Sequence, residues 1–242
     1  MSGLNTVDRG SDSAHVTRVW RSQGPGAKRM LSVTNSNWEL VFMEFEGSVS
    51  VTVRGPETSP SLVELPEEGS AIGIVFAHGT ALEGLPVPRL VDAAVTEPAD
   101  DAGRRMELGG ETWEIPRYDS VEDFVAKLSA AGLLRHDRLV ADVAAGADDH
   151  GLGPRATQLR VKALTGLTRT AIRQIERARA AAMMLQDGRP IIEAVHELDY
   201  YDQPHLSHAL SRFIGRTASE LRRGDPDVPL SLLYKTPGWP AE

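Results

Sequence analysis

At 242 residues, with 41% hydrophobic and 25% charged side chains, the chain has the composition of a globular protein of one large domain or two ordinary ones. The absence of cysteine excludes disulfides, thiolate metal sites and a cysteine nucleophile. The sequence contains no run of about 18 apolar residues, so it predicts no membrane span. Residues 1–13 are too polar for a secretory signal, so we expect a cytoplasmic protein with no membrane partner.

The net charge of −8 is divided unevenly along the chain. Residues 1–149 carry 13 Lys and Arg against 24 Asp and Glu, a net of −11, whereas residues 150–223 carry 12 against 7, a net of +5. A basic half in an acidic chain indicates either a nucleic-acid surface or an ordinary solvated face. The charge alone leaves both interpretations open.

Residues 1–118 predict short β-strands separated by Pro and Gly. Apolar runs cover residues 15–21 and 71–77, and valines at 49, 51 and 53 alternate with polar neighbours as in a half-buried strand. Residues 38–45 lead into that strand through a hairpin turn with Gly47 at the position that needs positive φ. We expect a β-rich N-terminal domain, a barrel or a sandwich.

Residues 119–149 predict two linker helices. Apolar residues recur there at helical spacing, Ser120 is a good N-cap, and Gly132 divides the stretch. Residues 150–223 follow as an all-α domain, so the fold class is α+β. The last segment, 224–242, is rich in Pro and Gly and is expected to be irregular, with leucines that can dock it onto a neighbouring element.

A short pattern occurs twice in the basic half, at an offset of 49 residues. Residues 164–168 (LTGLT) and 213–217 (FIGRT) share the order apolar, x, Gly, x, Thr. Gly at this place closes one helix in the left-handed conformation, and Thr two residues later caps the next. Thr217 with Glu220 additionally forms a capping box. The repeat therefore predicts two equivalent places where one helix ends and another begins.

Upstream of the second glycine, the apolar positions of residues 191–198 and 206–213 each lie on one helical face, with residues 199–201 between them. Two short helices joined by such a turn fit a helix-turn-helix unit. Polar side chains then face outward from the second helix and offer hydrogen-bond donors and acceptors. The alternative is an amphipathic helix with a solvated polar face, and the repeat favours the helix-turn-helix.

Residues 188–207, GRPIIEAVHELDYYDQPHLS, resemble the signature of AraC/XylS transcriptional regulators, and residues 153–166, GPRATQLRVKALTG, resemble that family's first helix-turn-helix unit. The resemblance covers roughly residues 138–223. It implies two recognition helices in successive major grooves of double-stranded DNA, joined by a helix over residues 168–185. It further implies an activator of bacterial type that contacts RNA polymerase, with a cupin-like N-terminal sensor and a possible homodimer.

Carried over to this chain, the resemblance together with the outward helical faces assigns ten DNA-binding residues: Arg155, Gln158, Arg160, Lys162, Arg173, Gln203, His205, Ser207, His208 and Arg212. The chain also departs from the family pattern. Thr157 stands at an apolar core position, Leu159 and His208 stand where an arginine usually reads bases, and Asp199 replaces the turn glycine. We therefore expect the second unit to supply most of the sequence discrimination.

The N-terminal half offers few functional signals. Trp38, Phe42 and Trp113 can line an effector pocket or belong to an ordinary core. His15 and His78 are isolated, and no metal site, cofactor site or catalytic group is recognisable, so we expect no enzyme. The predicted function is a sequence-specific regulator controlled by a small molecule. The alternatives are an N-terminal domain that only dimerises or binds a protein and, more remotely, a cupin-like enzyme with an appended DNA-binding domain.

Overall fold

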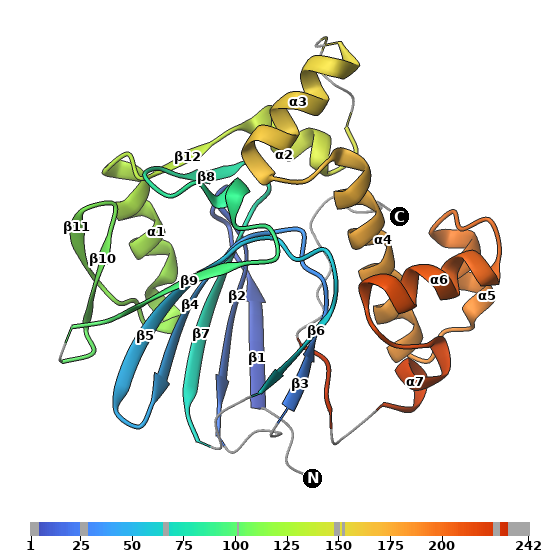
Figure 1. Ribbon diagram of the computed structural model, residues 1–242, viewed down its shortest axis with the longest axis horizontal. Helices are drawn as coiled ribbons and strands as arrows, with labels where there is room; N and C mark the ends of the chain where they lie inside the picture. Colours follow the sequence, from blue (N-terminus) through green and yellow to red (C-terminus); the bar gives the residue numbers. More distant parts are fainter. Residues whose placement is uncertain are drawn as a thin grey trace.

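The computed structural model describes residues 5–24, 29–64, 68–100, 102–147, 151, 153–224 and 228–231, and the fold is α+β. An antiparallel sheet forms most of the N-terminal half, and the helices of the C-terminal half stand on one side of it (Figure 1). Among the described residues, no helix combines the length and the apolar character that a membrane crossing requires.

Six antiparallel strands form the main sheet in the order β1-β2-β7-β4-β5-β9. Their bounds are β1 Asn5–Gly10, β2 Val16–Gln23, β7 Ser70–Phe76, β4 Glu39–Phe45, β5 Ser48–Arg54 and β9 Ala94–Pro98. Three strand pairs lie beside it: β3 Arg29–Ser32 with β6 Ser61–Glu64, β10 Arg105–Leu108 with β11 Glu111–Glu114, and β8 Thr80–Leu82 with β12 Leu134–His136. The described strands do not close into a barrel, so the expectation is confirmed only as a β-rich antiparallel region.

The hairpin between β4 and β5 forms where the sequence predicts it. Phe45 pairs with Ser48, and the two residues between them, Glu46 and Gly47, have φ of 49° and 76°. Two positive φ values in a two-residue loop match the twist of the strands that the loop joins. The hairpin fixes the register of β4 against β5 and thereby decides which side chains share a face.

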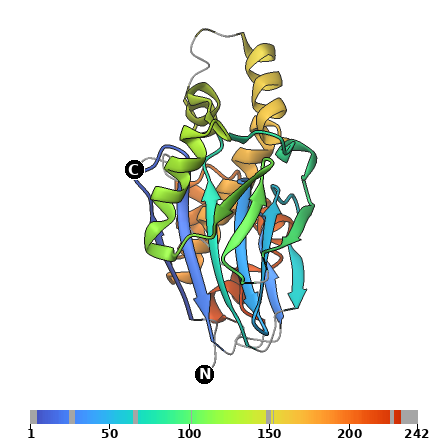
Figure 2. The same cartoon turned by 90° about the vertical axis from the view of Figure 1, so that its left-hand side faces the viewer.

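The two faces of the main sheet have different neighbours. Figure 2 shows α1 (Val121–Ala130) in front of the sheet and the C-terminal helices behind it. On the α1 side, Phe42 and Phe76 pack with Phe124 in the N-terminal core. On the opposite side, Trp20 lies so close to Gly73 that a Cβ there would stand 2.0 Å from the indole ring. Gly73 therefore lets Trp20 lie flat on the face that points toward the C-terminal half.

Residues 119–147 contain the two helices that the sequence predicts, but a short strand that the sequence does not predict lies between them. α1 packs into the N-terminal core, strand β12 pairs with β8, and α2 (Arg138–Ala144) packs into the C-terminal core. Ser120 precedes α1 as the sequence predicts, but its hydroxyl pairs with the backbone of Arg117 and accepts no N–H from the first turn of α1. The stretch is thus shared between the two cores.

The C-terminal half is helical, as expected. Its helices are α3 Pro154–Thr165, α4 Arg169–Gln186, α5 Ile191–Glu197, α6 Gln203–Phe213 and α7 Ala218–Arg223. Two short 3-10 turns, η1 Val87–Arg89 and η2 Tyr118–Ser120, belong to the N-terminal half. α4 is central, and its fully buried Ile172, Ile175 and Leu185 pack against the other helices. Its length corresponds to about 27 Å at 1.5 Å per residue.

The predicted helix ends are confirmed. Gly166 and Gly215 have φ of 77° and 73°. Thr168 accepts a hydrogen bond from the Ala171 N–H, and Thr217 forms the capping box with Glu220. Each glycine also touches the N-terminal half, because a Cβ at Gly166 would meet η1 and the residues after it, and one at Gly215 would meet β3.

Polar contacts also join the two halves. Both the N–H and the hydroxyl of Thr34 donate to the carbonyl of Phe213, at 3.1 and 2.8 Å. Ser36 lies between the buried side chains of His78 and Glu176. Near the C-terminus, Ser231 donates its N–H to Leu31 of β3 at 2.8 Å, so part of the expected irregular tail docks onto the N-terminal half. The leucines and the tyrosine at positions 232–234 lie outside the described residues.

Candidate functional site

The outward face of α6 carries the predicted polar residues. Leu206, Leu210 and Phe213 are buried, whereas the five assigned side chains are exposed: Gln203, His205, Ser207, His208 and Arg212. Asp202 begins the helix by accepting the His205 N–H at 2.8 Å. Pro204 lies in the first turn, where its missing N–H has no intrahelical partner to lose.

The turn before α6 is held by a residue of α4 that sequence reasoning left outside the site. Arg177 lies over the ring of the buried Tyr200, 4.2 Å from its centroid, and donates to the carbonyl of Asp199 at 3.3 Å. Asp199 has φ of 53°, as expected for a residue in the place of a turn glycine. Burial, opposed by Arg177, raises the pKa of Tyr200 to about 12. The sequence feature that could have identified Arg177 is its four-residue spacing from Arg173, because side chains four residues apart share one face of a helix.

His205 has a defined orientation in this turn. Its Nδ1 accepts the Tyr201 N–H at 3.3 Å, and its ring meets Tyr200 edge-on. A ring nitrogen that accepts carries no proton, so Nε2 is the nitrogen that carries it. His205 is thereby positioned as a hydrogen-bond donor on the exposed face.

Helices α4 and α6 share a small surface hollow of about 50 Å³. It is lined by Gln174, Arg177, Tyr200, His205, His208, Ala209, Arg212 and Phe213. The two histidines and two arginines bring together side chains that donate hydrogen bonds or carry positive charge. The structure thus adds two α4 residues, Gln174 and Arg177, to the surface assigned to α6.

Helix α3 carries a second exposed surface at one end of α4 (Figure 1). Its four assigned residues are exposed: Arg155, Gln158, Arg160 and Lys162. Leu159 is 62% exposed and Thr157 is 2% exposed, so the hydroxyl is buried and the leucine faces outward. Arg173 on α4 is exposed as well. The structure does not bring the α3 side chains together with those of α6, which lies alongside α4.

Arg160 already has an acidic partner. Its Nε lies 2.7 Å from the carboxylate of Asp137, which also accepts the Val140 N–H and so caps α2. Burial alone would raise the pKa of Asp137, but the hydrogen bonds from Arg160 and Val140 outweigh it and hold the pKa below its usual value. The ion pair links α3 to α2, and a phosphate would have to compete with it.

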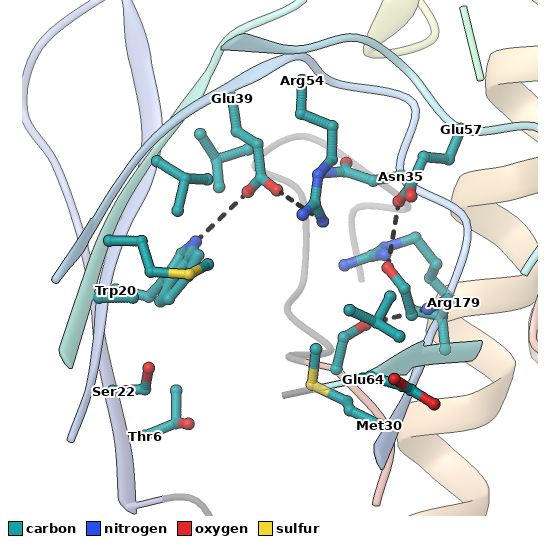
Figure 3. Close-up of a pocket in the computed structure, with 18 residues that line it drawn as sticks. Thr6, Trp20, Ser22, Met30, Asn35, Glu39, Arg54, Glu57, Glu64 and Arg179 are labelled. Carbon is teal, nitrogen blue, oxygen red and sulfur yellow. Dashed lines mark hydrogen bonds and ion pairs between the residues drawn. The ribbon is translucent and has the colours of Figure 1, made fainter. Parts of the chain in front are cut away.

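A cavity of about 170 Å³ lies between the main sheet, the β3–β6 pair and α4 (Figure 3). Its walls are Thr6, Trp20, Ser22, Met30, Ser32, Val33, Asn35, Glu39, Val41, Met43, Arg54, Glu57, Val63, Glu64, Ala71, Val75, Arg179 and Ser231. Most of the wall surface is apolar. Its charged groups lie along the upper and right-hand sides of the cavity in Figure 3: Glu39, Arg54, Glu57, Glu64 and Arg179. Such a cavity is typical of a small-molecule site.

Four of the five charged groups of the cavity wall, Glu39, Arg54, Glu57 and Arg179, contact neighbouring groups, and the fifth is Glu64. Glu39 lies 3.4 Å from Arg54 and accepts the Trp20 indole N–H at 3.4 Å. Arg179 of α4, 2% exposed, donates to the carbonyl of Thr34 at 2.6 Å. Glu57 accepts from Ser32 at 3.3 Å, and burial raises its pKa to about 7 against the opposing effect of Arg54.

The three aromatic residues assigned to an effector pocket lie elsewhere. Trp38 stacks on Phe76 at 3.9 Å between ring centroids and donates to the Thr80 carbonyl, and Phe42 packs against α1. Trp113 on β11 donates to Leu108. None of the three lines the described cavity, and Trp20 does. Side chains alternate between the two faces of a sheet, and the sequence does not show which face borders the cavity.

The histidines of the N-terminal half make ordinary contacts. His15 meets His136 edge-on and pairs with Ser129, while His78 is buried beside Ser36. Burial lowers the pKa of His78, which favours the neutral ring. Within the part of the chain that the structure describes, no group of three or more His, Asp or Glu is placed to hold a metal ion.

Comparison with models of protein families, with curated proteins and with solved structures finds no match to this chain. The function is therefore inferred from the geometry of the two helical surfaces and the cavity.

Proposed function

We propose that this protein is a sequence-specific regulator of transcription that binds double-stranded DNA through two helix-turn-helix units, α2–α3 and α5–α6. One observation carries the proposal. α3 and α6 occupy equivalent places in the pattern that repeats at an offset of 49 residues, and each is followed by a left-handed glycine. All ten assigned side chains stay exposed, although the N-terminal half packs against the same helices. The N-terminal half thus leaves both candidate recognition surfaces uncovered.

The chemistry of α6 suits the major groove, which is wide enough to admit a helix. Gln203, Ser207 and His208 offer donors and acceptors for base edges, and Arg212 offers a guanidinium for phosphate. Arg177 anchors the turn before α6 and so fixes the angle at which the helix leaves it. A base-reading helix needs such an anchor, because hydrogen bonds to bases depend on direction.

The spacing of the two units also supports the proposal. α4 joins them with a length of about 27 Å, comparable to the ~34 Å helical repeat of DNA. α3 and α6 can therefore address successive major grooves on one side of a duplex. This arrangement agrees with the resemblance to AraC/XylS regulators, and the cavity beside α4 supports control by a small molecule in a cupin-like sensor half.

The test is the salt dependence of DNA binding by the full chain. Residues 150–223 carry a net charge of +5, so binding should release several counterions from the duplex. We expect the affinity for a sequence selected from a random pool to fall steeply between about 50 and about 200 mM salt, measured by fluorescence anisotropy. A salt-independent affinity, or no selected sequence, would exclude the proposal.

A charge-matched control separates phosphate contacts from general electrostatics. Lys162→Gln should lower the slope of log affinity against log salt by about one. Arg105→Gln removes the same charge from the exposed side of β10, which lies across the main sheet from the C-terminal helices (Figure 1). Its slope should equal that of the unmodified chain.

A further inference from the structure

Two arginines from different halves of the molecule point into the cavity. Arg54 reaches down from β5 and Arg179 reaches in from α4, with their guanidinium groups facing the same space in Figure 3. Arg179 is 2% exposed, so its charge lies almost entirely inside the protein. Arginine does not lose its proton in proteins, so the cavity wall holds two permanent positive charges beside the carboxyl groups of Glu39, Glu57 and Glu64.

We propose that this cavity binds a small monocarboxylate with a compact apolar body, held between the guanidinium groups of Arg54 and Arg179. Paired guanidinium groups favour a carboxylate because each presents parallel N–H donors that match its two oxygens. This inference deepens the proposed function and rests on it only for the regulatory consequence below.

The cavity limits the size and the character of the ligand. Its volume of about 170 Å³ is close to that of an engineered apolar cavity in another protein, about 150 Å³, which accepts benzene. Trp20, Met30, Met43 and Val41 supply apolar surface to the wall. Methionine side chains adapt to different shapes, so the wall tolerates variation in the apolar body. We therefore expect a ligand with one ring or a short branched chain.

Glu57 determines how the cavity accommodates an added negative charge. It lies among Arg54, Glu39, Arg179 and Ser32, and burial raises its pKa to about 7. A bound carboxylate would favour the neutral form of Glu57 further, so binding should take up a proton near pH 7. The ligand's affinity should then fall as the pH rises through about 7. A cationic ligand would reverse both effects, since it favours the ionised form.

Arg179 links the cavity to the candidate DNA-binding surface. It belongs to α4 and donates to the carbonyl of Thr34, whose N–H and hydroxyl donate to Phe213 at the end of α6. A ligand that binds Arg179 contacts α4 directly. It also competes for Arg179 with the carbonyl of Thr34, a contact that joins the helical half to the N-terminal half. Ligand binding should therefore change the affinity for DNA, and DNA should change the affinity for the ligand by the same factor.

The first experiment uses calorimetry on the full chain with phenylacetate, phenylacetamide and benzylamine, which share one ring and differ in charge. We expect phenylacetate to bind best and to take up a proton near pH 7, measured from the heats in two buffers of different ionisation enthalpy. Tighter binding of benzylamine, proton release on phenylacetate binding, or no binding of phenylacetate up to about 10 mM would overturn the proposal.

Variants then test the two arginines. Arg54→Gln should weaken phenylacetate about 10- to 100-fold, because a hydrogen bond to a charged group contributes about that factor. Arg18→Gln is the matched control, since Arg18 also lies on a strand beside an acid, Asp8, but outside the cavity wall. Arg179→Gln should show the same loss, and Arg54→Gln keeps the test valid if the buried Arg179 variant fails to fold. Unchanged affinity in Arg54→Gln would contradict the assignment.

The regulatory consequence is tested separately, so that the two proposals can fail independently. DNA affinity is measured with and without saturating phenylacetate on the selected sequence, and a change of about 5- to 150-fold is expected. If no DNA sequence is selected but phenylacetate binds through Arg54, the proposed function fails and the carboxylate site stands. If DNA binds and phenylacetate does not, the site fails and the DNA-binding function stands.

Discussion

Helices α3 and α6 are equivalent in the repeat yet are held in the protein very differently. At the offset of 49 residues, Thr157 corresponds to Leu206, and both side chains are buried. Gly153 corresponds to Asp202 at the N-cap, but only Asp202 supplies a side-chain hydrogen bond to its helix. The same framework thus carries a weakly anchored helix in the first unit and a firmly anchored one in the second.

The outward faces differ in the same direction. Leu159 corresponds to His208, so α3 presents an exposed leucine where α6 presents an imidazole. Arg160 of α3 is paired with Asp137, whereas α6 shares its polar surface with Arg177 and Gln174 of α4. Accurate hydrogen bonding to bases needs both suitable donors and a fixed helix. If the protein binds DNA as proposed, we expect α6 to discriminate between sequences and α3 mainly to bind the DNA backbone.

The largest expected effect concerns the cores of the two helices. Leu206→Ala should lower the free energy of unfolding by about 2–5 kcal/mol, because it leaves a cavity at a fully buried position. Thr157→Ala at the equivalent position should cost less, about 1–2 kcal/mol, since it removes one methyl group and one buried hydroxyl. Chemical denaturation of both variants measures the difference. Equal losses would show that α3 is anchored as firmly as α6.

The division of labour on DNA is expected at about 1–3 kcal/mol per mismatched base pair. A mismatch scan across the selected sequence should show such penalties in the half-site that α6 contacts and a shallow profile in the half-site of α3. Comparable penalties in both half-sites would contradict the comparison. They would indicate that Leu159 recognises a thymine methyl group by apolar contact.

Within α6, two neighbouring exposed residues should have separable roles. His208→Ala should reduce discrimination at one base pair by about 1–3 kcal/mol, the range for a lost base contact. Arg212→Ala should weaken binding to all sequences alike and reduce the salt slope by about one. A repeated selection with each variant measures both effects. An unchanged preference in His208→Ala would show that this face does not enter the groove.

The smallest expected effects come from the helix caps. Asp202→Ala should destabilise the protein by about 0.5–2 kcal/mol, because the His205 N–H loses its acceptor. Gly153→Asp should stabilise it by a few tenths of a kcal/mol, since Gly153 has negative φ and open space at its Cβ. Thermal unfolding of the two variants measures both shifts. A destabilised Gly153→Asp would mean that the start of α3 cannot use a side-chain cap.

Local features of this protein could be derived from its sequence. The glycines at 47, 166 and 215, the threonine caps and the positive φ of Asp199 all depend on residues within a few positions of each other. Steric limits on φ and the need to satisfy helix-end donors act over the same short range. The burial of Thr157 and the exposure of the ten assigned side chains follow from helical periodicity.

Only the tertiary structure decided which distant residues meet. Thr34 and Arg179 are 145 residues apart, and Thr34 and Phe213 are 179 apart, yet these contacts join the sheet to the helices. The alternation in β4 predicts two faces, but packing alone decides that Phe42 faces α1 and that Glu39 and Val41 border the cavity. For the same reason Trp20, and none of the three tryptophan and phenylalanine residues chosen from the sequence, lines the cavity. Local periodicity assigns a side chain to a face, and the partner of that face depends on how the whole chain packs.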